Sequence, residues 1–183
     1  MTHTIKTRIS VNLAHLTACL ILLVSSFAMA QRPAPPALAV PNPNYVSVYL
    51  EIDVNKSATD VWKRVGKYCD IGEWLNIPGG CKMLSGKEGE VGSVRSVANE
   101  ILVAKTELSY AYTQPVRKGV LYNLYHGNLE ARPIDEKTSK LVYTLVYDDS
   151  LLENDEARKA QITRLNAIFT RALNNMKKLA EES

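Results

Sequence analysis

Histidine and cysteine are scarce in this chain, with three of each among 183 residues. Beyond residue 30 only His126, Cys69 and Cys81 remain. Two cysteines and one histidine make a poor ligand set for zinc, and a site built from several histidines is excluded. The chain also lacks a phosphate-binding loop, a dinucleotide fingerprint and a nucleophile triad. We therefore expect neither a metal nor a cofactor.

Long apolar runs are almost absent, and the one present, Leu13–Val24, is too short for a comfortable membrane span. It follows a basic start with Lys6 and Arg8 and precedes the small-x-small sequence Ala28-Met29-Ala30. This arrangement is typical of a secretory signal peptide, with cleavage expected before Gln31.

An alternative for this region is a lipoprotein box at Leu16-Thr17-Ala18-Cys19, but the apolar run continues past Cys19, where such a box should close it. We expect residues 1–30 to be a signal peptide and the protein to be periplasmic. No membrane span is expected after cleavage.

Neither sign of charge is in excess, because 20 basic and 19 acidic residues remain beyond residue 30. This balance argues against nucleic acid or an anionic membrane surface as a partner. Residues 31–44 contain five prolines and no periodicity, and they are predicted to be an extended spacer. Residues 45–183 suit one domain with a sizeable core.

Hydrophobic periodicity predicts the elements of that domain. Residues 45–54 alternate, with Val46 and its even-numbered neighbours facing inward. Ser57 and Asp60 have the spacing of a capping box that begins a short helix, which should end at 66–69. The further predicted strands are 82–86, 92–97, 99–105, 107–115, 120–133 and 139–149.

A second capping box, Ser150 with Glu153, is predicted to begin one long amphipathic helix that runs to Glu182. The predicted class is therefore α+β, with a curved antiparallel sheet of about seven strands wrapped around a long C-terminal helix. Space between the sheet and the helix would be the natural binding site.

The ordered series of motifs resembles the SRPBCC superfamily, the START-like and birch-pollen-allergen-like helix-grip proteins. The resemblance is carried by residues 60–75, Gly92-Ser93-Val94-Arg95, Glu100-Ile101-Leu102, "SYAY", Tyr125, "KLVYTLVY" and the final helix. It is similar in particular to the polyketide cyclase/dehydrase branch and to exported methanol-oxidation accessory-type proteins. A helix-grip fold with two short helices near the N-terminus is thus implied.

In such proteins the segment "YCDIGEWLNIPGG" (residues 68–80) forms a short second helix and the rim of the cavity. The resemblance implies that Trp74 lines or closes the pocket; the alternative is that Trp74 only anchors the helices to the sheet, which is what we expect of Trp62 at its helical core spacing. A Cys69–Cys81 disulfide would pin this segment in an oxidising compartment, although the sequence leaves open whether the two Cα atoms lie close enough.

Tyrosine is abundant where phenylalanine is rare, with nine tyrosines against two phenylalanines. Alternation places Tyr110 with Tyr112 on one strand face, and Tyr143 with Tyr147 on another that also carries leucines. Such a wall would suit a flat or phenolic ligand, whereas the simpler explanation is that tyrosine favours strands.

Few ionisable side chains are candidates for acid–base chemistry. Tyr125 should face inward and the adjacent His126 outward, so His126 would be a general base only if the local register breaks. Alternation places Glu100 outside, whereas the family's Glu-x-Leu pattern places it inside, where Arg95 would pair with it or bind an anionic ligand group. Asp70 is a helix-end residue or an acid at the pocket mouth.

Three functions fit these observations. The first is an exported, cofactor-free lyase or cyclase acting by acid–base chemistry on an aromatic, phenolic or lignin-type molecule. The second is a carrier of an apolar ligand, and the third is an accessory protein of an exported oxidoreductase. A protein partner or a homodimer is compatible with all three.

Overall fold

The computed structural model describes residues 40 and 42–183, so the expected signal peptide and most of the expected spacer lie outside the described residues. The described part is one antiparallel sheet with one long and two short helices. Its elements are β1 (Tyr45–Val54), α1 (Ala58–Val65), α2 (Ile71–Trp74), β2 (Met83–Ser85), β3 (Val94–Arg95), β4 (Glu100–Lys105), β5 (Ser109–Thr113), β6 (Asn123–Pro133), β7 (Ser139–Asp148) and α3 (Asp155–Glu181).

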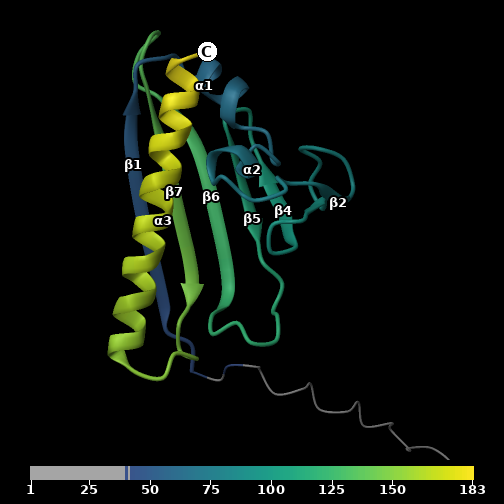
Figure 1. Ribbon diagram of the computed structural model, residues 1–183, viewed down its shortest axis with the longest axis vertical. Coiled ribbons are helices and arrows are strands. Elements are labelled where there is room, and N and C mark those ends of the chain that lie inside the picture. Colours follow the sequence, from purple (N-terminus) through teal and green to yellow (C-terminus); the bar gives the residue numbers. More distant parts are fainter. Residues whose placement is uncertain (1–39, 41) are drawn as a thin grey trace, which may run out of the picture. The chain divides into compact units, whose positions relative to one another are not determined.

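The sheet has seven strands in the order β1-β7-β6-β5-β4-β3-β2. The first and last strands are therefore neighbours, and they pair from Tyr45 with Asp148 to Val54 with Ser139. Helix α3 lies along β1 and β7, and α1 and α2 pack beside it over the same face (Figure 1). The predicted fold, a curved sheet of about seven strands that grips a long C-terminal helix, is confirmed.

Alternation on the long strands follows the prediction. On β1, Val48 and Val54 are buried whereas Tyr49 and Glu51 are exposed. On β6 the residues from Tyr125 to Ala131 alternate between buried and less buried positions in the same way. The apolar set of each strand thus faces the helices, which provides the core.

Helix α1 begins as its capping box predicts. The Ser57 side chain accepts a hydrogen bond from the Asp60 N–H and donates one to the Asp60 carboxylate. Gly66 ends the helix, at the first residue of the predicted range 66–69. The short second helix that the resemblance implied is α2.

The predicted start of the long helix is wrong. Asn154 is the N-cap of α3, and its side chain accepts a hydrogen bond from the Ala157 N–H, whereas the Ser150 N–H donates to Asp148 in a preceding turn. Asparagine caps a helix at least as well as serine, so two candidate caps competed and the later one was used. None of the described helices is long and apolar enough to span a membrane.

Strands β2 and β3 are shorter than the pattern suggested. Ala98 and Asn99 have φ values of 51° and 55°, in the left-handed region, and they form a tight turn between β3 and β4. This turn ends β3 at Arg95 and sets Arg95 directly opposite Glu100.

Candidate active site

The inner face of the sheet is lined by tyrosines from three adjacent strands. Tyr110 and Tyr112 of β5, Tyr125 of β6, and Tyr143 and Tyr147 of β7 are all at most 4% exposed. The Tyr125 and Tyr147 rings are stacked with centroids 6.2 Å apart, and the Tyr112 and Tyr143 hydroxyls are 2.8 Å apart. The predicted wall of tyrosines is therefore present, and in the described part its rings fill much of the space in which a cavity was expected.

Two aromatic residues from the helices complete this packing. Trp74 of α2 meets Tyr143 edge-on at 6.2 Å, and Phe169 of α3 lies 4.4 Å from the Tyr143 ring. The Trp74 carbonyl accepts a hydrogen bond from Asn175 of α3, which fixes α2 to α3. Trp74 is fully buried, so it occupies the anchoring position in this structure, whereas Trp62 is only partly buried and packs against Tyr110.

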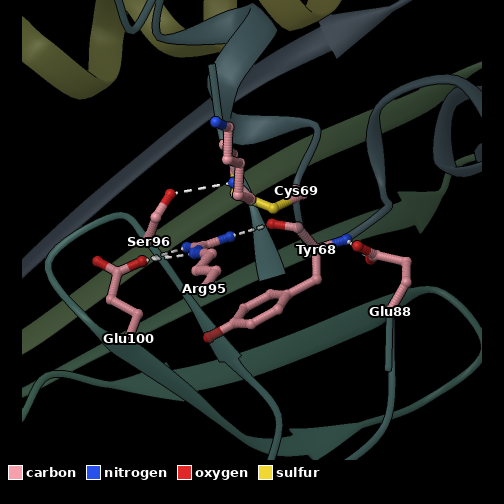
Figure 2. The surroundings of a disulfide bond; sticks show 8 residues. Tyr68, Cys69, Glu88, Arg95, Ser96 and Glu100 are labelled. Carbon is pink, nitrogen blue, oxygen red and sulfur yellow. Dashed lines mark hydrogen bonds and ion pairs between the residues drawn. A yellow bond between two sulfur atoms is a disulfide. The ribbon is translucent and has the colours of Figure 1, made fainter. Parts of the chain in front are cut away.

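A buried ion pair lies at the edge of the tyrosine wall. Arg95 is 0% and Glu100 2% exposed, and Arg95 Nε donates to Glu100 Oε2 over 2.6 Å (Figure 2). Glu100 therefore faces inward with Leu102, as the resemblance implied and simple alternation did not. The other carboxylate oxygen, Oε1, accepts a hydrogen bond from Gln114 Nε2 at 2.8 Å.

The Arg95 guanidinium is enclosed by tyrosine rings. Its central carbon lies 4.1 Å from the Tyr68 centroid, 4.7 Å from that of Tyr112 and 5.7 Å from that of Tyr110. Cation–π attraction of this kind stabilises a desolvated arginine and fixes its orientation. Arg95 is thus held by the Glu100 carboxylate, by three aromatic faces and by one backbone carbonyl.

The carbonyl belongs to Tyr68, and it links the ion pair to a disulfide. Arg95 Nη1 donates to the Tyr68 carbonyl, and the next residue, Cys69, is bonded to Cys81 with a Cα–Cα distance of 5.3 Å (Figure 2). The Tyr68 N–H donates in turn to Glu88. The disulfide-closed segment that contains α2 is therefore attached to β3 and to the loop before it.

Burial changes the acid–base properties of this cluster. It raises the pKa of Glu100 above the ordinary value, although Arg95 and Gln114 oppose the rise. Burial likewise raises the pKa values of Tyr112, Tyr125 and Tyr143, so their hydroxyls stay protonated at neutral pH. A carboxyl with a raised pKa beside neutral phenols has the chemistry needed for proton transfer.

Two predicted catalytic residues are not joined to this cluster. His126 is exposed on the outer face of β6, with Nδ1 2.7 Å from the Leu124 carbonyl. The register does shift between Asn123 and His126, but the shift leaves the imidazole outside. Asp70 is half-buried at the start of α2, where its carboxylate accepts a hydrogen bond from the Lys67 N–H and burial raises its pKa.

A hydrogen-bonded path leads from Glu100 toward the surface. The Tyr122 hydroxyl donates to Gln114 Oε1 at 2.8 Å, and Gln114 donates to Glu100. Tyr122 also lines a depression of about 280 Å³ formed with the preceding loop and with Gln161 and Arg164 of α3. We call this the α3 depression.

A second depression of about 260 Å³ reaches Tyr110 from the other end of the sheet, beside α1. We call it the α1 depression. Three residues that bridge the ion pair to these surfaces were not predicted from the sequence: Gln114, Tyr122 and Tyr68. Gln114 and Tyr122 lie near strand ends and Tyr68 in a loop, where periodicity says nothing about direction. In the described part no group of three or more histidine, cysteine or acidic side chains is placed to hold a metal.

A curved antiparallel sheet that grips a C-terminal helix over an aromatic inner face defines the helix-grip class, the SRPBCC superfamily. The chain belongs within it to the family described as polyketide cyclase / dehydrase and lipid transport, whose model matches residues 45–181. No curated protein matches the sequence.

Solved structures share the fold at low identity. A protein from Nitrosospira multiformis is 23% identical with a TM-score of 0.60, covering 73% of this chain and 94% of its own. The ZhuI aromatase/cyclase from Streptomyces sp. R1128 is 17% identical with a TM-score of 0.58, covering 76% and 95%. Norcoclaurine synthase from Thalictrum flavum is 15% identical with a TM-score of 0.56, covering 78% and 97%.

Proposed function

We propose that this protein is a cofactor-free enzyme of the cyclase or lyase type that acts by acid–base chemistry on an aromatic, phenolic small molecule. The observation that carries the proposal is the buried Glu100 carboxyl, whose pKa burial raises and which Gln114 connects to Tyr122 at the α3 depression. A buried acid joined to a surface opening is where acid–base catalysis is expected.

The proposed class of substrate follows from the tyrosines that line the inner face of the sheet. The rings of Tyr125 and Tyr147 are buried next to Tyr122, with the centroids of Tyr122 and Tyr125 5.1 Å apart, so a ligand that displaces Tyr122 would meet their flat apolar faces. Such faces favour a planar ring, and phenol hydroxyls favour a substrate with oxygen substituents. The aromatase/cyclase and the norcoclaurine synthase that share the fold have names consistent with this class.

In the proposed mechanism the Glu100 carboxylate removes a proton from the bound ring system, and Tyr125, whose hydroxyl stays protonated because burial raises its pKa, acts as the acid that returns a proton to the substrate. Arg95 or Tyr122 stabilises the negative charge that develops on a substrate oxygen. Both oxygens of Glu100 are occupied by Arg95 and Gln114, so Gln114 has to swing away as the substrate enters. This movement breaks the hydrogen bond from Tyr122 as well.

The test starts with a thermal-shift screen of phenolic and lignin-type compounds and continues with turnover assays on the hits. Glu100→Gln and Tyr125→Phe should lower turnover about 10²–10⁴-fold while ligand binding survives, because both changes nearly preserve shape. Glu130→Gln and Tyr49→Phe make the same chemical changes on the outer face of the sheet and should retain turnover. All assays are run well below the melting temperature of each variant.

Each outcome has a separate meaning. Turnover that survives both inner-face substitutions would contradict the assignment of Glu100 and Tyr125 while leaving an enzyme. Tight ligands that are never converted would contradict catalysis altogether.

Tight binding without conversion would favour a carrier of apolar ligands. One observation supports this second function. Arg95 and Glu100 satisfy each other, and packed tyrosine rings surround them. In an interior of this kind, contacts between tyrosine rings can be replaced by contacts with an apolar ligand, and no reaction is needed. If nothing binds, the exposed Leu121, which lines the α3 depression, and the exposed Leu151, next to its lining residue Leu152, would instead suit docking to a protein partner.

Export to the periplasm is part of the proposal. The Cys69–Cys81 disulfide supports it, because such bonds persist in oxidising compartments. Mass spectrometry of the protein recovered from its native cells should find Gln31 at the N-terminus. A lipid on Cys19 would instead place the protein on a membrane.

A further inference from the structure

The α1 depression lies between α1, the loop that joins β2 to β3, and the neighbouring ends of β4 and β5. Its floor is aromatic and apolar, built from Trp62, Tyr68, Leu102 and Tyr110. Tyr68 contacts Arg95, but the path from Glu100 to Tyr122 runs through Gln114 and includes none of these four residues. The depression is therefore a separate surface from the one to which we assign the chemistry.

The floor is fixed in place before any ligand arrives. Tyr68 and Tyr110 meet edge to face at 5.4 Å, and Trp62 lies 5.6 Å from Tyr110. A side chain at Gly66 would collide with the Trp62 ring, so this glycine allows the indole to lie across the end of α1. Trp62 is only partly buried, and its ring remains available to a ligand.

The rim of the depression is basic. Lys63 and Lys67 from the α1 end and Lys105 from β4 line it, and none of the three has an ion pair with another described residue. The acid on the rim is Glu88, whose carboxylate already accepts the Tyr68 N–H. Three cations against one acid leave an excess of positive charge, which attracts anions.

Size narrows the choice of ligand. A volume of about 260 Å³ lies just below the range of about 300–1,000 Å³ that is usual for drug-sized ligands. One aromatic ring with a short substituent fits this space better than a fused polycyclic compound. A bare phosphate would make no use of the aromatic floor, and a neutral phenol would gain little from the positive charge of the rim.

We propose that the α1 depression binds a small aromatic carboxylate. The ring packs against Trp62 and Tyr110, and the carboxylate lies among Lys63, Lys67 and Lys105. This is a second binding site, and it does not depend on the proposed catalysis at Glu100.

Tryptophan fluorescence offers a direct readout, because Trp62 lines the depression whereas Trp74, the other described tryptophan, is fully buried. Benzoate and 4-hydroxybenzoate should change the emission saturably, and benzamide, the neutral match of benzoate, should bind at least about tenfold more weakly. The benzoate affinity should fall as salt rises, since the lysines are exposed.

Substitutions locate the site. Lys63→Met and Lys67→Met keep the apolar stems and remove the charges, and each should weaken benzoate binding roughly two- to fivefold. Lys159→Met, on an exposed position of α3, is the matched control and should bind as the unchanged protein does. Trp62→Leu should abolish binding, measured by titration calorimetry because the reporter is gone.

Equal affinity for benzamide and benzoate would overturn the proposal, and so would unchanged affinity in both lysine variants. Absence of benzoate binding by fluorescence and by calorimetry at millimolar concentration would overturn it as well. Tyr125→Phe separates the two proposals, because Tyr125 does not line the α1 depression: it should leave benzoate affinity intact even where it lowers turnover. Loss of turnover alone therefore says nothing against this site.

Discussion

Tyr112 lies against Gly127, its partner across β5 and β6, so closely that any side chain at position 127 would collide with the tyrosine ring. This space lets the Tyr112 hydroxyl reach that of Tyr143 on β7, two strands away. A glycine in a strand is usually a weakness, but here it makes room for a cross-strand aromatic contact.

Gly127→Ala should therefore displace Tyr112 and break its hydrogen bond with Tyr143. Overpacking of this kind costs about 1–3 kcal/mol in the free energy of unfolding, which urea denaturation measures. Near-ultraviolet circular dichroism should change as well, since the tyrosine cluster rearranges. Asn128→Ala, at the next position on the outer face, should alter neither; equal behaviour of the two variants would contradict the packing described.

Breaking the buried ion pair should destabilise the fold strongly. Arg95→Met or Glu100→Gln alone leaves a buried partner without its match and should cost about 3–5 kcal/mol. The double variant Arg95→Met/Glu100→Gln should cost less than the sum of the two single variants, because no buried charge remains. Arg132→Met removes one partner of the exposed Arg132–Glu130 pair and should cost less than about 1 kcal/mol. Strict additivity in the double variant would rule out coupling.

The disulfide should contribute through the unfolded chain. Cys69 and Cys81 are 12 residues apart, and closing a loop of this length stabilises a domain by about 3 kcal/mol in the chain-entropy description. A Cys69→Ser/Cys81→Ser variant should lose about this amount in urea unfolding. Reductant should destabilise the unchanged protein and leave the variant unaffected. Two reactive thiols in the denatured, unreduced protein that begins at Gln31 would contradict the bond.

Alkaline pH should unfold the protein. Burial raises the pKa values of Tyr110, Tyr112 and Tyr143 above the ordinary 10.0. The unfolded chain releases these protons near pH 10 while the folded chain retains them, so the unfolded state binds fewer protons. Stability is therefore fully present below about pH 10 and falls as the pH rises above it.

Urea midpoints measured from about pH 8 to about pH 11 would test this, with phenolate absorbance recorded in parallel. Absorbance from the buried tyrosines should rise together with unfolding. A midpoint that does not change over this range would mean that the hydroxyls ionise within the fold.

Much of the fold could be predicted from the sequence because long strands have a simple period. Tyr125, Tyr143 and Tyr147 were placed inward correctly, since each lies on a strand of ten or eleven residues with clear alternation. The start of α3 could not be fixed in this way, because Ser150 and Asn154 are both acceptable caps. The turn made by residues 149–152 places Ser150 before the helix, and Asn154 is therefore the residue that caps it.

The site was less predictable than the fold. Glu100 is the first residue of β4, where alternation with Ile101 and Val103 pointed to the wrong face, and only the resemblance pointed inward. Gln114 and Tyr122 bond to each other across a loop, a contact that no local pattern encodes. Contacts between strand ends and loops depend on tertiary structure, and so they emerged only there.

The pairing of β1 with β7 has a consequence for how the chain reaches its folded state. The sheet's first strand has no hydrogen-bonded neighbour until the residues of β7 exist, because β7 separates it from every other strand. Helix α3, which packs on β1, comes later still. Contacts between such distant segments make closure slow, so we expect β1 to remain unpaired until nearly all of the chain has been synthesised. The complete sheet therefore depends on the last third of the chain, and a polypeptide truncated before β7 should be unable to fix its own first strand.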